Sequence, residues 1–556
     1  MILKKYNTFY LLSFFFVCGC SVLQSQSSER AIISNIKQKN NRLTAKEWKN
    51  WQHKDIFIDT IAGISLDKAY DELLKNKKAN TITVAVLDMR IHKNHEDIKE
   101  FIWENSNEIP NNGIDDDDNG YIDDINGWNF LGNASGQQAY RANFEYVRII
   151  RKYQDMFGNK KDIKPANLDE YNIYSRARKV YENELKYVKG KLMYYDSIEK
   201  DQKRLESDLS KLFPNKSLTI KELKTFEAKD SIVLKKIELL KKYVVNFKKN
   251  KSRRAVEQRY VDIYLNSDYN ERVIIGDDIS NIHDIVYGNN IIESDTTANT
   301  HTHAIKVAGL IAANRNNNKG IKGVINNVKI MPISISPYGD EQDKDVALGI
   351  RYAVNNGAKV INISSSKEFS LNQEWVLDAM LYAKSKNVLI VTSAGNESKN
   401  LNNAFNYPND TNKKNKEVLN NFIKVGASGY SLDESLVHYT SNYGKRDVDI
   451  FAPGRYIFTT HANNSYNFSS GTSLATPLVS GIASLIFSYY PNLTAAEVKQ
   501  IIMESGISLD IMANKPSRSK EKELVPFSSL SKSGKIVNAY NALLMAEEVS
   551  KKKKQN

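Results

Sequence analysis

A serine at the start of an apolar helix is the first feature of this sequence that could do chemistry. Ser473 lies in the segment GTSLATP, between Gly471 and Pro477, and the apolar run LVSGIASLIF follows. The glycine permits a tight turn, and the proline fits the first turn of a helix, where its missing N–H would have no partner. The free N–H groups and the helix dipole would then favour negative charge beside Ser473, as in an acyl-transfer intermediate. A turn that only caps a helix is the alternative.

Three further polar residues precede this serine, each at the end or start of an apolar element. Asp88 ends the β-branched run TITVAVLD, and ligands and catalysts of open α/β sheets lie at such strand ends. His303 opens the small-residue helical stretch HAIKVAGLIAA. Asn396 follows the run VLIVTS and a glycine, so its amide could donate into a site; an ordinary turn asparagine is the alternative.

The order Asp88, His303, Ser473, with Asn396 before the serine, resembles the subtilisin-like serine proteases, the subtilase family. The likeness extends to the segments VINIS, SAGN, SNYG, VDIFAPG and SSGTSLATP. It covers roughly residues 55–130 and 270–545. It implies a serine endopeptidase that acts on peptide or protein substrates. His303 would take the Ser473 proton, Asp88 would orient the imidazole, and Asn396 would donate to the oxyanion.

The resemblance also implies a substrate-binding strand. Ser364, Ser365 and Ser366 match the family's strand beside the primary specificity pocket. The substrate backbone would pair there as an added strand. No cofactor is required for this chemistry.

The sequence departs from the family pattern around the triad. Met89 and Arg90 stand where the family has Ser or Thr and then Gly, and Ala304-Ile305-Lys306 replaces Gly-Thr-His. Ser366 replaces a glycine. We expect two cations, Arg90 and Lys306, near the triad and a cleft narrowed at Ala304 and Ser366. The alternative function is therefore a catalytically weak pseudoprotease that binds peptides or proteins.

An acidic stretch, DDDDNGYIDD, contains the D-x-D-x-N-G spacing of calcium loops. Oxygen ligands at alternate positions converge when a glycine permits the sharp turn. The ligands we expect are Asp115, Asp117, Asn119 and Asp123. Position twelve is Asn126 instead of Glu, so an EF-hand is not expected. A structural calcium ion and an acidic loop closed by its own hydrogen bonds are the two interpretations.

The elements that must position these residues follow an alternating pattern. The chain has 556 residues, 41% hydrophobic and 26% charged, which excludes disorder throughout and fibrous classes. Short apolar runs alternate with amphipathic stretches around 340–356 and 371–386. The runs span 81–88, 328–335, 359–364, 388–393, 422–427 and 447–452. We expect the α/β class, a subtilisin-like three-layer fold with a mostly parallel central sheet, plus an all-helical insertion.

The positive charge is confined to one block. The whole chain has a formal net charge of +13. Residues 141–260 alone contain 31 Lys and Arg against 17 Asp and Glu, a net charge of +14, so the rest of the chain has a net charge of −1. Long Lys/Glu/Leu/Tyr stretches at helical period fill this block, so we expect a basic helical insertion over 134–270. Because the remaining chain is neutral, no nucleic-acid partner is expected.

The N-terminus resembles a bacterial lipoprotein signal. Lys4 and Lys5 precede an apolar run that ends in Val-Cys-Gly-Cys, too short for a membrane span. We expect a signal peptide over 1–19 and lipidation of Cys20, and an ordinary signal peptide is the alternative. The protein would be exported and anchored by lipid to a membrane of the bacterial cell envelope. The remaining predicted segments are a tether at 20–50, a catalytic domain at 51–133 and 271–546, and a Lys-rich tail at 547–556.

Overall fold

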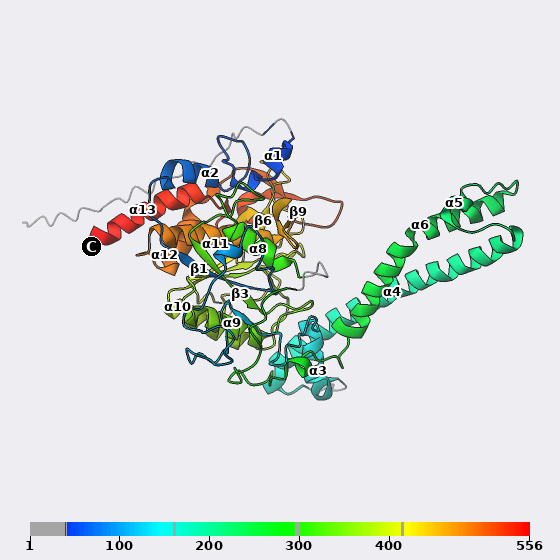
Figure 1. The fold of residues 1–556 in the computed structure, drawn as a ribbon, viewed down its shortest axis with the longest axis horizontal. Coiled ribbons are helices and arrows are strands. Elements are labelled where there is room, and N and C mark those ends of the chain that lie inside the picture. The colour runs from blue at the N-terminus through cyan, green and yellow to red at the C-terminus, as the bar shows by residue number, and fades with distance from the viewer. Residues whose placement is uncertain (1–38, 40–41, 159–162, 295–300, 413–415, 556) are drawn as a thin grey trace, which may run out of the picture.

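The computed structural model describes residues 39, 42–158, 163–294, 301–412 and 416–555. The predicted signal peptide and Cys20 lie outside the described residues. Among the residues described, the fold consists of a globular body and a long helical projection (Figure 1).

A nine-stranded sheet runs through the body, in the order β10-β13-β7-β6-β5-β4-β1-β3-β2. All neighbours pair in parallel except β10 and β13. Its strands are β1 Ile82–Asp88, β2 Trp128–Asn129, β3 Val328–Ser334, β4 Val360–Ile363, β5 Leu389–Ser393, β6 Phe422–Ser428, β7 Ile450–Pro453, β10 Ile507–Ser508 and β13 Lys535–Ile536. Two hairpins stand apart from it: β8 Ile457–His461 with β9 Ser465–Ser469, and β11 Met512–Asn514 with β12 Leu524–Pro526.

Helices cover both faces of the sheet, which confirms the predicted three-layer α/β class. One core contains Val84 and Val86 of β1 and the helices α8, α11, α12 and α13. The other contains Ala85 and Leu87 of the same strand and the helices α9 and α10. Successive strand side chains point to opposite faces, so a strand buried on both faces reads as a continuous apolar run. The helices of the body are α1 Ala45–Trp48, α2 Leu66–Ala69, α8 His303–Ala312, α9 Asp343–Asn355, α10 Gln373–Ser385, α11 Thr472–Tyr489, α12 Ala495–Ser505 and α13 Ala539–Gln555.

Helix α11 is apolar on all sides because it lies inside the body. It packs against β1, β4, β5, β6 and β7 and against α8. By length and composition alone it also fits a membrane span, but 89% of its apolar window is buried within the protein. This burial explains the composition, since a helix that is apolar all round is a core helix in a globular fold.

Both ends of the described body are more ordered than the sequence suggests. Leu43 is buried and Thr44 forms a capping box with Glu47, so packing begins inside the predicted tether. At the other end α13 continues through the Lys-rich segment to Gln555.

The projection, here called the arm, comprises the described residues 145–158 and 163–264. Figure 1 shows α4 and α6 running side by side away from the body, with α3 at their base. The distal part has its own small core, which includes Leu205, Leu209 and Leu240. The core at the base also contains Phe369 of the body. The helices here are α3 Glu145–Phe157, α4 Leu168–Leu212, α5 Ile220–Leu223 and α6 Ser231–Arg259, and α7 Arg272–Ile275 follows.

Candidate active site

Asp88 and His303 meet at the carboxyl edge of the sheet. Asp88 is the last residue of β1, the strand between β3 and β4, and its side chain is buried. His303 is the first residue of α8, and its Nδ1 atom lies 2.7 and 2.9 Å from the two Asp88 carboxylate oxygens. The Met89 N–H also donates to this carboxylate at 2.7 Å. One imidazole nitrogen is thereby committed to a carboxylate that is itself held in place.

The surroundings of His303 raise its pKa above the ordinary value. Burial by itself would lower the pKa, but the charge and hydrogen bond of Asp88 outweigh it. Lys306, one turn along α8, opposes this rise, and Glu341 adds to it. The imidazolium form is therefore stabilised beside Asp88, while 35% of the His303 side chain stays exposed to solvent.

Ser473 is the second residue of α11. Its neighbours Thr472 and Leu474 are buried, whereas Ser473 is only half-buried. The turn therefore directs this one side chain towards the surface.

The predicted position of Pro477 is wrong: α11 begins at Thr472, so the proline lies in the second turn. There it removes the N–H that would donate to the Ser473 carbonyl.

Asn396 lies beside Ser473, across the turn that precedes α11. A Cβ atom built on Gly471 would lie 3.4 Å from Ser473 Oγ and 3.5 Å from Asn396 Nδ2. Gly471 has a φ of +147°, and the absent side chain leaves the space between the two polar groups open. The Thr472 N–H donates to Asn396 Oδ1 at 3.0 Å.

The departures from the family pattern affect the site unequally. Arg90 points away: its guanidinium donates to the Glu293 carbonyl at 3.0 Å and to the Tyr140 hydroxyl at 3.1 Å. Lys306 does act on His303, as its influence on the pKa shows. Ala304 is buried in the core instead of lining a cleft.

The three serines after β4 do not play equal parts. Ser364 is buried and its Oγ accepts from the Asn362 amide at 2.9 Å. Ser365 and Ser366 line a pocket of about 370 Å³ whose wall includes Glu341 and apolar side chains of α10. Ser366 Oγ also lies 3.0 Å from where a Cβ on Gly395 would be.

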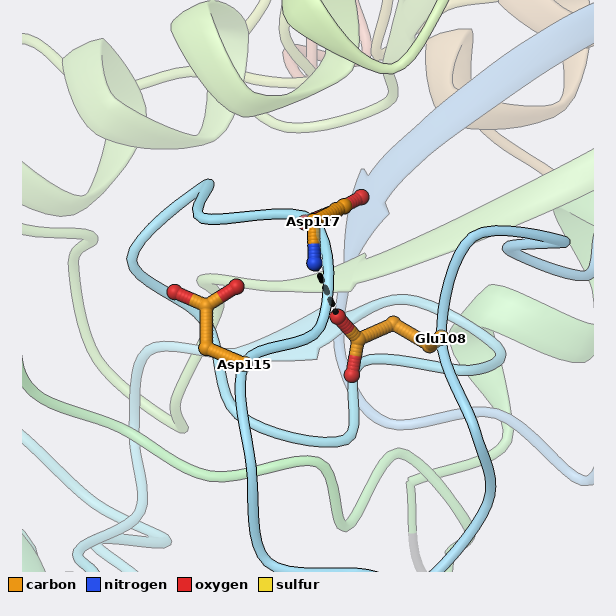
Figure 2. Close-up of side chains that lie close together, drawn as sticks. All are labelled: Glu108, Asp115 and Asp117. Atoms are coloured by element: carbon orange, nitrogen blue, oxygen red, sulfur yellow. Dashed lines mark hydrogen bonds between the residues drawn. The ribbon is translucent and has the colours of Figure 1, made fainter.

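The acidic loop brings together a set of carboxylates that differs from the predicted one. Asp115 and Asp117 converge with Glu108, and their ligand oxygens lie within 4.8 Å of one another (Figure 2). Asn119 Oδ1 accepts from the Tyr121 N–H, and its amide donates to Asp124.

Asp123 lies outside this carboxylate group. Its oxygens accept the N–H groups of Asn112 and Gly113. Sequence spacing missed Glu108, because this residue precedes the motif and no ligand pattern points to it.

The carboxylate group fits a cation. Glu108 is 6% exposed, and within the described chain its Oε2 atom and the Asp117 Oδ1 atom are buried without hydrogen-bond partners. Burial and the nearby charges of Asp124 and Asp117 raise the pKa of Glu108 against the effect of two backbone N–H donors. A divalent cation would satisfy both orphaned oxygens and offset the repulsion.

Comparisons with known proteins identify the family to which the chain belongs. The sequence model of the subtilase family matches residues 79–528. Over 225 residues the chain is 35% identical to the cell wall-associated protease of Bacillus subtilis (strain 168), covering 40% of this chain and 23% of that protein. Over 206 residues it is 34% identical to thermitase of Thermoactinomyces vulgaris, covering 37% of this chain and 68% of thermitase.

A solved structure of a protease from Pseudoalteromonas arctica PAMC 21717 also matches. It shares 27% identity with the chain at a TM-score of 0.36, covering 44% of this chain and 70% of that one. The chain thus spans about a quarter of the length of the cell wall-associated protease and about two thirds of that of thermitase.

Proposed function

Because the chain belongs to the subtilase family, we propose that it is a serine endopeptidase with Asp88, His303 and Ser473 as its triad. The observation that carries this proposal is the contact between His303 Nδ1 and the Asp88 carboxylate, at 2.7 and 2.9 Å. With Nδ1 committed, Nε2 is the nitrogen left to act as a base.

In the first half of the reaction, Ser473 Oγ attacks the scissile carbonyl carbon while His303 Nε2 takes the hydroxyl proton. The carbonyl oxygen becomes an oxyanion, which accepts from Asn396 Nδ2 and from a main-chain N–H at the start of α11. Asp88 stabilises the imidazolium formed in this step.

The second half releases both products. The C–N bond breaks as His303 returns the proton to the leaving amine, and the acyl group remains on Ser473. Water then attacks the ester, again with His303 as the base, and frees the acid and the serine hydroxyl.

Labelling with a fluorophosphonate probe tests the proposal, since the probe reacts with an activated serine. We expect the purified protein to be labelled and to cleave peptides, and Ser473→Ala to do neither. Ser197→Ala, an exposed serine of α4, is the control and should be labelled like the wild type. An unlabelled, folded wild type that still binds peptides would instead establish the pseudoprotease alternative.

We further propose that the enzyme is exported and lipid-anchored to a membrane of the cell envelope through Cys20. The support is the basic start, the short apolar run and the cysteine that ends it. Cys20→Ser should abolish lipidation measured by intact mass, whereas the matched variant Cys18→Ser should not. A mature N-terminus elsewhere, without lipid, would contradict the anchor.

The carboxylate group of Glu108, Asp115 and Asp117 is proposed to hold a structural calcium ion. The support is the pair of orphaned buried oxygens. Calcium should raise the unfolding temperature of the wild type relative to EDTA, and Glu108→Gln should remove most of this increase. Asp118→Asn, a neighbouring acidic residue outside the group, is the control.

A further inference from the structure

A second hollow lies beside Asn396. It is separate from the pocket lined by Ser365 and Ser366, because the two have no lining residue in common. It measures about 390 Å³ and its wall includes Asn396, Ser470, His438, Arg455 and Arg518. Ser470 directly precedes the turn that carries Ser473. This surface is here called the arginine hollow. It includes the proposed oxyanion donor Asn396, which does not line the pocket of Ser365 and Ser366.

Hydrogen bonds link the backbone beside Arg455, and the side chain of Arg518, to residues of the proposed active site. The Gly471 N–H donates to the carbonyl of Gly454 at 2.8 Å, and Arg455 is the next residue. Arg518 lies in the loop between β11 and β12, and its guanidinium donates to the main-chain carbonyl of Asn396 at 2.7 Å. The two cations thus approach the site from chain segments that are distant in sequence.

The arginine hollow is cationic without a compensating acid. None of its lining residues is a carboxylate. Among the described residues the Arg518 guanidinium contacts the Asn396 carbonyl and the Arg455 guanidinium lies over the Tyr456 ring, and neither forms an ion pair. Burial and the charge of Arg455 lower the pKa of His438 to about 4, so His438 is neutral at pH 7. The positive charge of this surface therefore comes from the two guanidinium groups.

We propose that the arginine hollow selects an acidic side chain within the first two residues after the scissile bond. This inference rests on the proposed endopeptidase function, in which the segment after β4 that contains Ser365 and Ser366 holds the acyl side of the substrate. The leaving segment must then extend past Asn396 in the other direction, into the arginine hollow. A guanidinium presents a planar fork of N–H donors that matches a carboxylate. Arg455 is half-buried, which strengthens such a pair, and Arg518 is exposed at the rim of the hollow.

Internally quenched peptides that differ only by Glu or Gln at these two positions test the proposal, since the two side chains have the same shape. We expect wild-type kcat/KM to be about tenfold higher for Glu. Arg455→Gln and Arg518→Gln should each lower this Glu/Gln ratio, and the double variant should bring it close to one. Lys520→Gln removes a charge from the same loop outside the hollow and should leave the ratio unchanged.

The outcomes separate this proposal from the proposed function. A wild type that reacts with the fluorophosphonate probe but cleaves Glu and Gln peptides equally would overturn the acidic preference alone. A preference that survives in the double variant would also overturn it, because other groups would then read the carboxylate. Absence of probe labelling and of cleavage would overturn the endopeptidase function and this specificity together.

Discussion

The main-chain N–H of Thr472 donates to Oδ1 of Asn396 over 3.0 Å, and this bond fixes which way the amide faces. A backbone N–H can only donate, so the amide oxygen must occupy that position and the NH₂ group must lie at the other end. Residue 472 immediately precedes Ser473, so the turn that presents the serine also orients the amide beside it.

Loss of the Asn396 amide should slow turnover. In Asn396→Ala we expect kcat to fall about 10²–10³-fold with KM nearly unchanged, because the donor acts on charge that develops in the transition state. Asn396→Asp should be similarly slow, since a carboxylate cannot donate. Steady-state kinetics on one peptide measures both, and Asn403→Ala, an exposed asparagine, is the control. A rise in KM at constant kcat would show instead that Asn396 only binds substrate.

Replacement of Asp88 should damage catalysis more than folding. Asp88→Asn keeps the shape of the side chain but allows the amide to favour the wrong His303 tautomer, and we expect kcat to fall by about 10⁴. Circular dichroism and thermal unfolding should remain close to wild type. If the variant retained a tenth or more of the activity, Asp88 would not be the partner that orients the base.

The pH profile should report the surroundings of His303. The base must be deprotonated, so kcat/KM should rise with pH through a midpoint above the ordinary histidine value of about 6.5. Lys306 lowers this pKa and Glu341 raises it. Lys306→Gln should therefore move the acidic limb to higher pH, and Glu341→Gln should move it to lower pH.

The control for the pH profile is Lys359→Gln. Lys359 is an exposed cation next to the start of β4, at the opposite edge of the sheet, so its loss should leave the midpoint unchanged. Shifts in the reverse directions for the two test variants would show that another group controls the limb.

Sequence patterns predicted the position of strands that are buried on both faces of the sheet. The run that became β1 and the runs that became β5 and β6 are apolar and β-branched, and each strand lies within a residue or two of its predicted span. The short strands β2 and β13 were missed, because a pair of residues carries no period. Arg518 and Glu108 were missed because they reach their sites through tertiary structure, and no local spacing marks them.

The contacts between the arm and the body could not be predicted from the sequence. A helical block with a net charge of +14 indicates an accessory unit. Among the described residues, the ion pairs that join this block to the body all involve α3, whereas Arg176 of α4 stacks on Phe369 and Phe405 of the body. On α3, Arg148 forms a buried ion pair with Glu145 and donates to the carbonyls of Asp340 and Glu341. Lys367, in the wall of the Ser365 pocket, lies 3.5 Å from Glu145. The base of the arm therefore packs as part of the body.

This division predicts opposite results for two changes in the arm. Asp196 and Arg254 form an ion pair across α4 and α6, so the two helices lie side by side there and a short Gly/Ser linker can replace residues 199–251. That deletion should change the free energy of unfolding of the body by less than about 1 kcal/mol and preserve probe labelling, since the segment removed has its own core.

Arg148→Ala should instead cost about 3–5 kcal/mol, because it leaves Glu145 buried with one partner fewer. Urea denaturation followed by tryptophan fluorescence measures the free energy of unfolding of both variants. Arg253→Ala, which removes an exposed arginine of α6, is the matched control. If the deletion unfolded the body while Arg148→Ala did not, the body would depend on the distal helices of the arm rather than on α3.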